Sequence, residues 1–178
     1  MFFKCYLVLI VMNKYSRKYS RIVDKLITES FRELKEAKIR IVEFPEFFSF
    51  WSFAEKSFSG FFIFINKSQR NLDAISLKGE FAHELCHIIL DHRNKSLLGD
   101  LFHNFRKFLS FIFNTKFSRE IESKIDKEVI KRGYAKELIA DHKSWNKFLS
   151  KENVENLYTR GYLSPKEIKS YARSIGRW

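Results

Sequence analysis

Residues 71–92 predict one long, largely buried helix, because apolar side chains recur there every three or four positions. His83 and His87 lie within this segment, four residues apart. Residues at that spacing are separated by about 40° around a helix axis and about 6 Å along it, so both imidazoles lean over one face. Glu84 follows His83 at about 100° around the axis. The segment therefore presents two nitrogen ligands with a carboxylate beside them.

This arrangement is the geometry of a zinc site. Zinc binds imidazole nitrogen, and in hydrolytic sites it leaves one position open for water, whose pKa it lowers. Glu84 is then placed to accept a proton from that water. The alternative is a helix that carries two histidines without a metal. We expect one zinc ion, held by His83 and His87, in a metal-dependent hydrolase.

Composition indicates a single folded domain with extensions. The chain has 178 residues, of which 45% are hydrophobic, and its 20 Phe against six Gly and two Pro favour a mostly helical, aromatic-packed protein. A net charge of +12 makes nucleic acid or an anionic membrane surface a partner to consider. However, the basic residues alternate with Glu in predicted helices, as on a solvated face, so nucleic-acid binding is not favoured.

The cysteines and the N-terminus bear on where the protein acts. Cys5 and Cys86 are too few for a disulfide framework, which favours a reducing, cytoplasmic location. The apolar stretch 5–12 is too short to cross a bilayer of about 30 Å as a helix. We therefore expect no transmembrane span. Residues 1–16 are interpreted as an extension or a strand, with weak membrane association as the alternative.

The remaining pattern predicts an α+β fold. Residues 17–150 form the expected domain, and 151–178 form a C-terminal helical extension. Period-two and aromatic runs predict a small sheet ahead of the motif helix, and longer periodic segments predict helices. The expected strands are 38–44, one within 47–53, and 61–65, and the other expected helices are 19–38, 118–132, 135–150 and 165–175.

Two histidines do not complete a zinc site, so a third ligand must come from elsewhere. A third histidine shortly after the motif is excluded, because Leu90 stands where that pattern needs Gly and Arg93 where it needs His. The candidates are His92, His103, Glu122, Glu137 and His142.

Two carboxylate pairs compete for this role. Glu122 and Asp126 are four apart on a predicted helix, so the first can bind zinc while the second fixes a ligand histidine's tautomer through a hydrogen bond. Glu137 and Asp141 repeat the same spacing and are the alternative pair. For either pair the ordinary outcome is a pair of exposed helix carboxylates.

The combined motifs resemble a known family. His-Glu-x-x-His, then Ser118-Arg-x-x-Glu-x-x-x-Asp126 and Gly133-Tyr134, are similar to the gluzincin metallopeptidases. The similarity is to HtpX and CAAX prenyl-protease membrane enzymes and to their soluble relatives, the minigluzincins. Ile125 and Cys86 depart from the family pattern, which usually has Ala and a small residue such as Gly at those positions.

The resemblance implies a zincin-like fold, with a small, mostly antiparallel sheet packed on an active-site helix and a glutamate helix. It implies His83, His87 and Glu122 as zinc ligands, Glu84 as general base and acid, and Asp126 behind a ligand. It also implies a strand at the cleft rim to which a peptide substrate adds antiparallel. That substrate-binding strand would be Phe61, Phe62, Ile63, Phe64 and Ile65.

The expected function is therefore a zinc-dependent endopeptidase acting on peptides or unfolded proteins. Its C-terminal helix, residues 164–178, could lie over the cleft and keep it latent, and His103 or His142 could stabilise the oxyanion. The alternatives are an SprT-like or ImmA/IrrE-like protease acting on DNA-associated proteins, or a catalytically silent, zinc-stabilised binding module.

Overall fold

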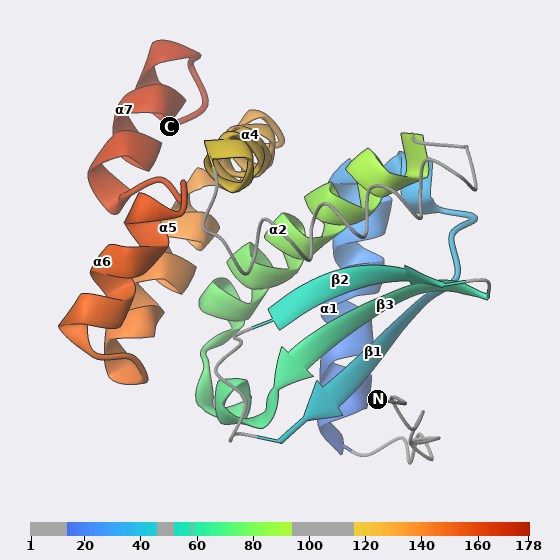
Figure 1. The fold of residues 1–178 in the computed structure, drawn as a ribbon. Coiled ribbons are helices and arrows are strands. Elements are labelled where there is room, and N and C mark those ends of the chain that lie inside the picture. The colour runs from blue at the N-terminus through green and yellow to red at the C-terminus, as the bar shows by residue number, and fades with distance from the viewer. Residues whose placement is uncertain (1–13, 46–51, 58, 94–115) are drawn as a thin grey trace.

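The computed structural model describes residues 14–45, 52–57, 59–93 and 116–178 (Figure 1). Three predicted features lie wholly or partly outside these residues: the N-terminal segment 1–16, the second predicted strand, and His103. In the described part the protein is α+β and mostly helical, with six α-helices and one three-stranded sheet. No helix in these ranges is both long enough and apolar enough to cross a membrane.

Helix α2 (Ala74–Arg93) confirms the predicted motif helix and runs through the centre of the molecule. It begins after Asp73, whose Oδ1 accepts a 2.7 Å hydrogen bond from the Ser76 backbone N–H and so satisfies a free donor of the first turn. Most of its apolar side chains are buried, whereas Ile75 in the first turn is exposed, so packing of one broad face stabilises the helix although it also carries charged side chains. These core positions include Leu77, Phe81, Leu85 and Ile88.

The sheet is mixed rather than mostly antiparallel, which corrects the prediction. Its strands are β1 (Ile39–Phe44), β2 (Ser52–Ser57) and β3 (Gly60–Asn66), arranged in the order β1-β3-β2. β2 and β3 pair antiparallel as a hairpin, whereas β1 and β3 are parallel. A parallel pair needs a crossover, and here β2 itself lies within the connection between β1 and β3.

The position of β3 contradicts its predicted role as the substrate-binding strand. β3 is central, and every residue from Phe61 to Ile65 has a partner in β1 and another in β2. Its backbone hydrogen-bonding edges are therefore both occupied, so no peptide can add to it. The side chains of Phe61, Ile63 and Ile65 are instead buried in the core.

The remaining helices lie on two sides of α2 (Figure 1). Helix α1 (Lys14–Ser30) covers the sheet, and the C-terminal helices lie on the opposite side of α2. They are α4 (Lys116–Lys131), α5 (Ala135–Ser144), α6 (Lys151–Thr159) and α7 (Pro165–Ser174). Helix α1 is shorter than the expected 19–38 at its C-terminal end, since the chain turns into a 3-10 segment at Arg32–Leu34.

Helices α2 and α5 approach each other very closely at Gly79. A Cβ atom at this position would lie 2.3 Å from the Glu137 carbonyl oxygen, so only glycine fits. A second glycine, Gly161 after α6, has a φ of 109° and would place a Cβ 2.3 Å from the Arg119 carbonyl oxygen. The first contact holds α5 against the motif helix, and the second holds the loop after α6 against α4.

Candidate metal centre

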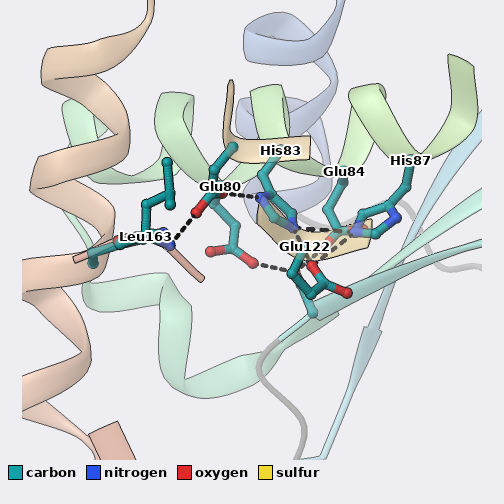
Figure 2. Close-up of polar contacts among 9 residues, drawn as sticks. Glu80, His83, Glu84, His87, Glu122 and Leu163 are labelled. Carbon is teal, nitrogen blue, oxygen red and sulfur yellow. Dashed lines mark hydrogen bonds and ion pairs between the residues drawn. The ribbon is translucent and has the colours of Figure 1, made fainter. Parts of the chain in front are cut away.

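The structure brings His83 and His87 of α2 together with Glu122 of α4. His83 Nε2 lies 3.1 Å from His87 Nε2 and 3.2 Å from Glu122 Oε2, and His87 Nε2 lies 3.4 Å from the same oxygen. Figure 2 shows both rings pointing toward this carboxylate. These three residues form a group that could hold a metal ion.

These distances fit a tetrahedral metal ion. Ligand atoms at about 2.0–2.1 Å from a tetrahedral zinc are separated from one another by about 3.3 Å. The three observed separations, 3.1, 3.2 and 3.4 Å, lie on either side of that value. The three atoms therefore occupy one face of a suitable coordination tetrahedron, and a fourth position is left for another ligand.

Asp126 orients His83. Its Oδ1 lies 3.0 Å from His83 Nδ1, and its Oδ2 accepts a 2.7 Å hydrogen bond from the Leu163 backbone N–H. Because Nδ1–H donates to the carboxylate, Nε2 is the nitrogen that faces the metal site, and it carries the lone pair when His83 is neutral. Asp126 is fully buried, and the bond from Leu163 holds it in place.

The ligands carry strongly shifted pKa values. Burial alone would lower the pKa of His83, but hydrogen bonds with Asp126 and Glu122 outweigh it and raise this pKa well above its usual range. Burial would raise the pKa of Glu122, but the charges of His87 and His83 and their hydrogen bonds lower it. The carboxylate is therefore ionised at neutral pH, as a metal ligand must be.

Glu84 lies beside the ligands and is 4% exposed. Its Oε1 accepts a 2.6 Å hydrogen bond from Ser52 Oγ at the start of β2. Its other oxygen, Oε2, has no hydrogen-bond partner among the described residues. One carboxylate oxygen is thus held in position and the other is free to accept a proton.

Behind Glu84 lies a second pair of buried carboxyl groups, Glu80 and Asp141, which are hydrogen-bonded to each other. Ser52 Oγ also contacts Glu80, although a hydroxyl carries only one hydrogen for two acceptors. Burial raises the pKa of Glu80, and burial together with the charge of Glu80 raises the pKa of Asp141 well above its usual range. The pair therefore retains a proton, which forms the hydrogen bond between Glu80 and Asp141.

Three aromatic side chains form the wall opposite these carboxyl groups. The Tyr162 ring stacks on His83 with centroids 5.4 Å apart, and the Trp145 ring stacks on His142 at 4.0 Å. His142 Nδ1 lies 2.9 Å from the Leu163 carbonyl oxygen, which can only accept, so this nitrogen carries the hydrogen. Burial lowers the pKa of His142 to about 4. The ring is therefore neutral at pH 7, with an unprotonated Nε2. It cannot donate a hydrogen bond to an oxyanion, so the prediction of that role for His142 is wrong.

His142 should make folding stability depend on pH. Its pKa is about 4 in the folded protein and about 6.5 when unfolded, so the unfolded chain binds the extra proton first. Its contribution is complete above pH 6.5 and falls by about 1.4 kcal/mol for each pH unit down to pH 4. Urea unfolding in chelator should show this slope in the wild type and lose it in His142→Asn, whose amide can still donate to Leu163. An equal slope in both proteins would contradict the prediction.

The structure distinguishes between the two predicted carboxylate pairs. Glu137 lies on α5 with an oxygen 3.6 Å from Lys78 Nζ, and the described metal-ligand cluster does not include it. Asp141 pairs with Glu80. No hydrogen bond among the described residues joins it to His83 or His87. His92 lies on α2, as predicted. Cys86 is buried, and burial raises the pKa of its thiol, so it remains protonated.

Sequence reasoning missed Ser52, Glu80, Tyr162 and the backbone of Leu163. Glu80 had a usable signal, since it precedes Glu84 by four residues and must share its helix face. The others come from β2 and from the loop after α6, and no local pattern places them at α2. No protein-family model, curated protein or solved structure matches the chain.

Proposed function

We propose that this protein is a zinc-dependent endopeptidase of the gluzincin type. The observation that carries the proposal is the cluster of His83, His87 and Glu122, with Glu84 held beside it on the same helix. A purely structural zinc site needs no general base, yet here a buried carboxylate with a free oxygen adjoins the ligands. A zinc ion bound there would supply Lewis acidity and a water of lowered pKa.

Glu84 is the proposed general base and acid. It takes the proton of the attacking water on Oε2 and returns it to the nitrogen of the departing amine. Ser52 holds Oε1, which fixes the direction of the free lone pairs. Burial of Glu84 strengthens these interactions because little water competes for them.

Tyr162 is the proposed donor to the developing oxyanion. Burial, together with the negative charges of Glu122 and Glu84, raises the pKa of this phenol well above its usual value, so it keeps its proton at neutral pH. Its ring is anchored on His83 by stacking. A preorganised donor beside a reacting carbonyl is typical of acyl-transfer sites.

The proposed substrate strand is β2 rather than β3. One edge of β2 pairs with β3, and its other edge has no strand partner among the described residues. Ser52 at the start of β2 contacts Glu84, so a peptide added along this edge would lie next to the catalytic carboxylate. The substrate would then be an extended peptide or an unfolded protein segment.

We also propose that the C-terminal region keeps the enzyme latent, although residues other than those of the predicted helix 164–178 contact the site. Helix α7 packs on α4 and α5, with Ile168 and Ala172 in the core. The residues of the C-terminal extension that contact the site are Leu157, Tyr162 and Leu163. Since Leu163 donates to Asp126, this loop supports the ligand arrangement as well as limiting access to it.

Metal removal tests the proposed function. Dialysis against a chelator should abolish cleavage of an unbiased peptide library, and adding one equivalent of zinc should restore it, because the open coordination position and its water depend on the metal. Cleavage is followed by mass spectrometry, which also reads the preferred sequence. Zinc-loaded protein that cleaves no peptide and no unfolded protein would instead favour the zinc-stabilised binding module.

A further inference from the structure

Helix α7 ends in a turn that reverses the direction of the chain. Gly176 has a φ of 67°, and its N–H donates to the Arg173 carbonyl at 3.2 Å. The next N–H, that of Arg177, donates to the Ala172 carbonyl at 2.7 Å. These two bonds form the glycine-based cap that commonly ends a helix. The cap holds the following residue, Trp178, against the helix, with 46% of its surface exposed.

Three cations surround the Trp178 ring. Lys169 Nζ and Arg173 Cζ, both from α7, lie 5.1 and 5.8 Å from the ring centroid. Lys136 Nζ, from α5, lies 5.9 Å from it. All three cationic residues are exposed. We call these four residues the Trp178 surface, and α7, which carries two of them, lies on the side of α5 away from the sheet (Figure 1).

No carboxylate neutralises these cations. The single acidic residue of α7, Glu167, is held in the capping box at the start of that helix. On α5, Glu137 lies 3.6 Å from Lys78, and Asp141 is buried in its carboxyl pair. None of the three cations forms an ion pair within the described ranges. The alternation of basic residues with Glu that is expected of a solvated helix is therefore missing from this surface.

Helix electrostatics do not explain the placement of these charges. Arg173 lies in the last turn of α7, where a cation is favourable. Lys136, however, is the second residue of α5, where the positive end of the helix dipole disfavours a cation. Lys169 and Arg173 are four residues apart on one helix face, so their like charges repel. An anionic partner would relieve this repulsion.

The arrangement fits a single-stranded nucleic acid. Proteins that bind single strands combine cations for the phosphates with aromatic rings on which unpaired bases stack. Each nucleotide joins a base to a phosphate, and here one half-exposed indole has three cations within 5.9 Å of its centroid. In a duplex the bases are paired and stacked on one another, so they offer no free face to this ring.

An anionic membrane fits this surface less well. A tryptophan that anchors a protein to a membrane places its ring at the boundary of the apolar layer. The ring of Trp178 would carry three cations into that boundary with it, and charged groups are costly there.

We propose that the Trp178 surface binds single-stranded nucleic acid. Lys136, Lys169 and Arg173 contact phosphates, and one unpaired base stacks on Trp178. These contacts read neither the base sequence nor the sugar, so DNA and RNA are both ligands. None of the four residues belongs to the metal centre, so the inference does not depend on the proposed peptidase function.

The test measures binding of the full-length protein to labelled oligonucleotides. The main probe is a fluorescein-labelled oligothymidylate of about 12 nucleotides, within the usual size of such sites, and anisotropy is recorded at several salt concentrations. Parallel probes are a duplex of the same length and an abasic strand with the same number of phosphates. Lipid vesicles with and without phosphatidylserine test the membrane alternative.

Replacing the three cations of the Trp178 surface together with Gln should weaken oligothymidylate binding at low salt. The slope of the logarithm of the association constant against the logarithm of salt concentration should become shallower by about 2, because each phosphate contact contributes about 0.7. The control removes three exposed charges elsewhere, with Lys25→Gln, Lys35→Gln and Lys151→Gln, and should keep the wild-type slope. Single replacements, each expected to change the slope by about 0.7, serve if the triple variant does not fold.

Trp178→Ala should lower affinity for oligothymidylate by at least about fivefold, the smaller end of the effect of losing one stacked base. Trp178→Phe should keep most of the affinity, since it retains a ring. The abasic strand has no base to stack, so the wild type and Trp178→Ala should bind it equally.

Four results would overturn the proposal. They are an equal loss in the charge-matched control, binding of the duplex as tight as that of the single strand, an unchanged affinity in Trp178→Ala, and binding to phosphatidylserine vesicles without binding to any oligonucleotide. The first would reduce the effect to net charge, and the last would assign the surface to a membrane. A change of slope confined to the Trp178 surface, together with a loss in Trp178→Ala that the abasic strand does not show, supports the proposal whether or not the protein cleaves peptides.

Discussion

We expect Glu84→Gln to lower kcat/KM for the proposed peptide hydrolysis by about 10²–10⁴-fold, the usual contribution of a general acid–base group. Glutamine keeps the shape of the side chain and can still accept the hydrogen bond from Ser52. It cannot take a proton from water at the free position that Glu84 Oε2 provides. The loss should fall mainly on kcat, because the proposed role of Glu84 is in proton transfer to and from the reacting atoms rather than in binding.

Bound metal must be measured on the same protein. Since Glu84 is not among the three clustered ligands, Glu84→Gln should retain the full zinc stoichiometry of the wild type. Glu137→Gln is the control, because it removes a carboxylate from α5 and should leave both activity and metal unchanged. Wild-type rates in Glu84→Gln would show that this carboxylate is not the base.

The sequence predicts the helical part of the site well. His83, Glu84 and His87 are placed by helix geometry alone, which does not depend on the rest of the fold. Glu122 and Asp126 follow the same rule, since the spacing of four fixes them to one face of α4. Only their contact with α2 required tertiary structure.

The sheet and the second carboxyl pair could not be predicted in the same way. Strand patterns identify β3, but its central position depends on β1 pairing with it in parallel, which no local signal specifies. Likewise Asp141 meets Glu80 only because Gly79 lets α5 approach α2 closely. Long-range packing, rather than local propensity, decides these features.

The choice between Glu122 and Glu137 illustrates the limit most clearly. Both stand four residues before an aspartate on a helix, so helix spacing alone does not separate them, and Glu122 was favoured only by the family-like residues around it. The structure gives Glu137 a lysine partner, Lys78, at 3.6 Å and gives Glu122 two histidines within 3.4 Å. A carboxylate facing a lysine is already neutralised, whereas one within reach of two imidazole nitrogens is suited to share a metal with them.

Glu122→Ala should therefore weaken zinc binding by more than about 100-fold. Loss of a hydrogen-bonding partner behind a ligand already costs about 10–100-fold in metal affinity, and a direct ligand should cost more. Affinity is measured by competition with a chromogenic chelator. Glu137→Ala should leave it unchanged, because that change removes only a surface ion pair, worth less than about 1 kcal/mol of folding stability.

Glu120→Ala supplies a matched control on α4, since Glu120 is exposed two residues from Glu122 and should bind zinc as the wild type does. Circular dichroism establishes that all three variants are folded before the titration. The reverse ranking, with full affinity in Glu122→Ala and weak binding in Glu137→Ala, would assign the third ligand to α5. Equal affinity in all variants would mean that the two histidines bind metal without a carboxylate. Asp126 lies on the same helix as Glu122 and orients His83 through a 3.0 Å contact. In either case its role would have to be reinterpreted as a purely structural contact with Leu163.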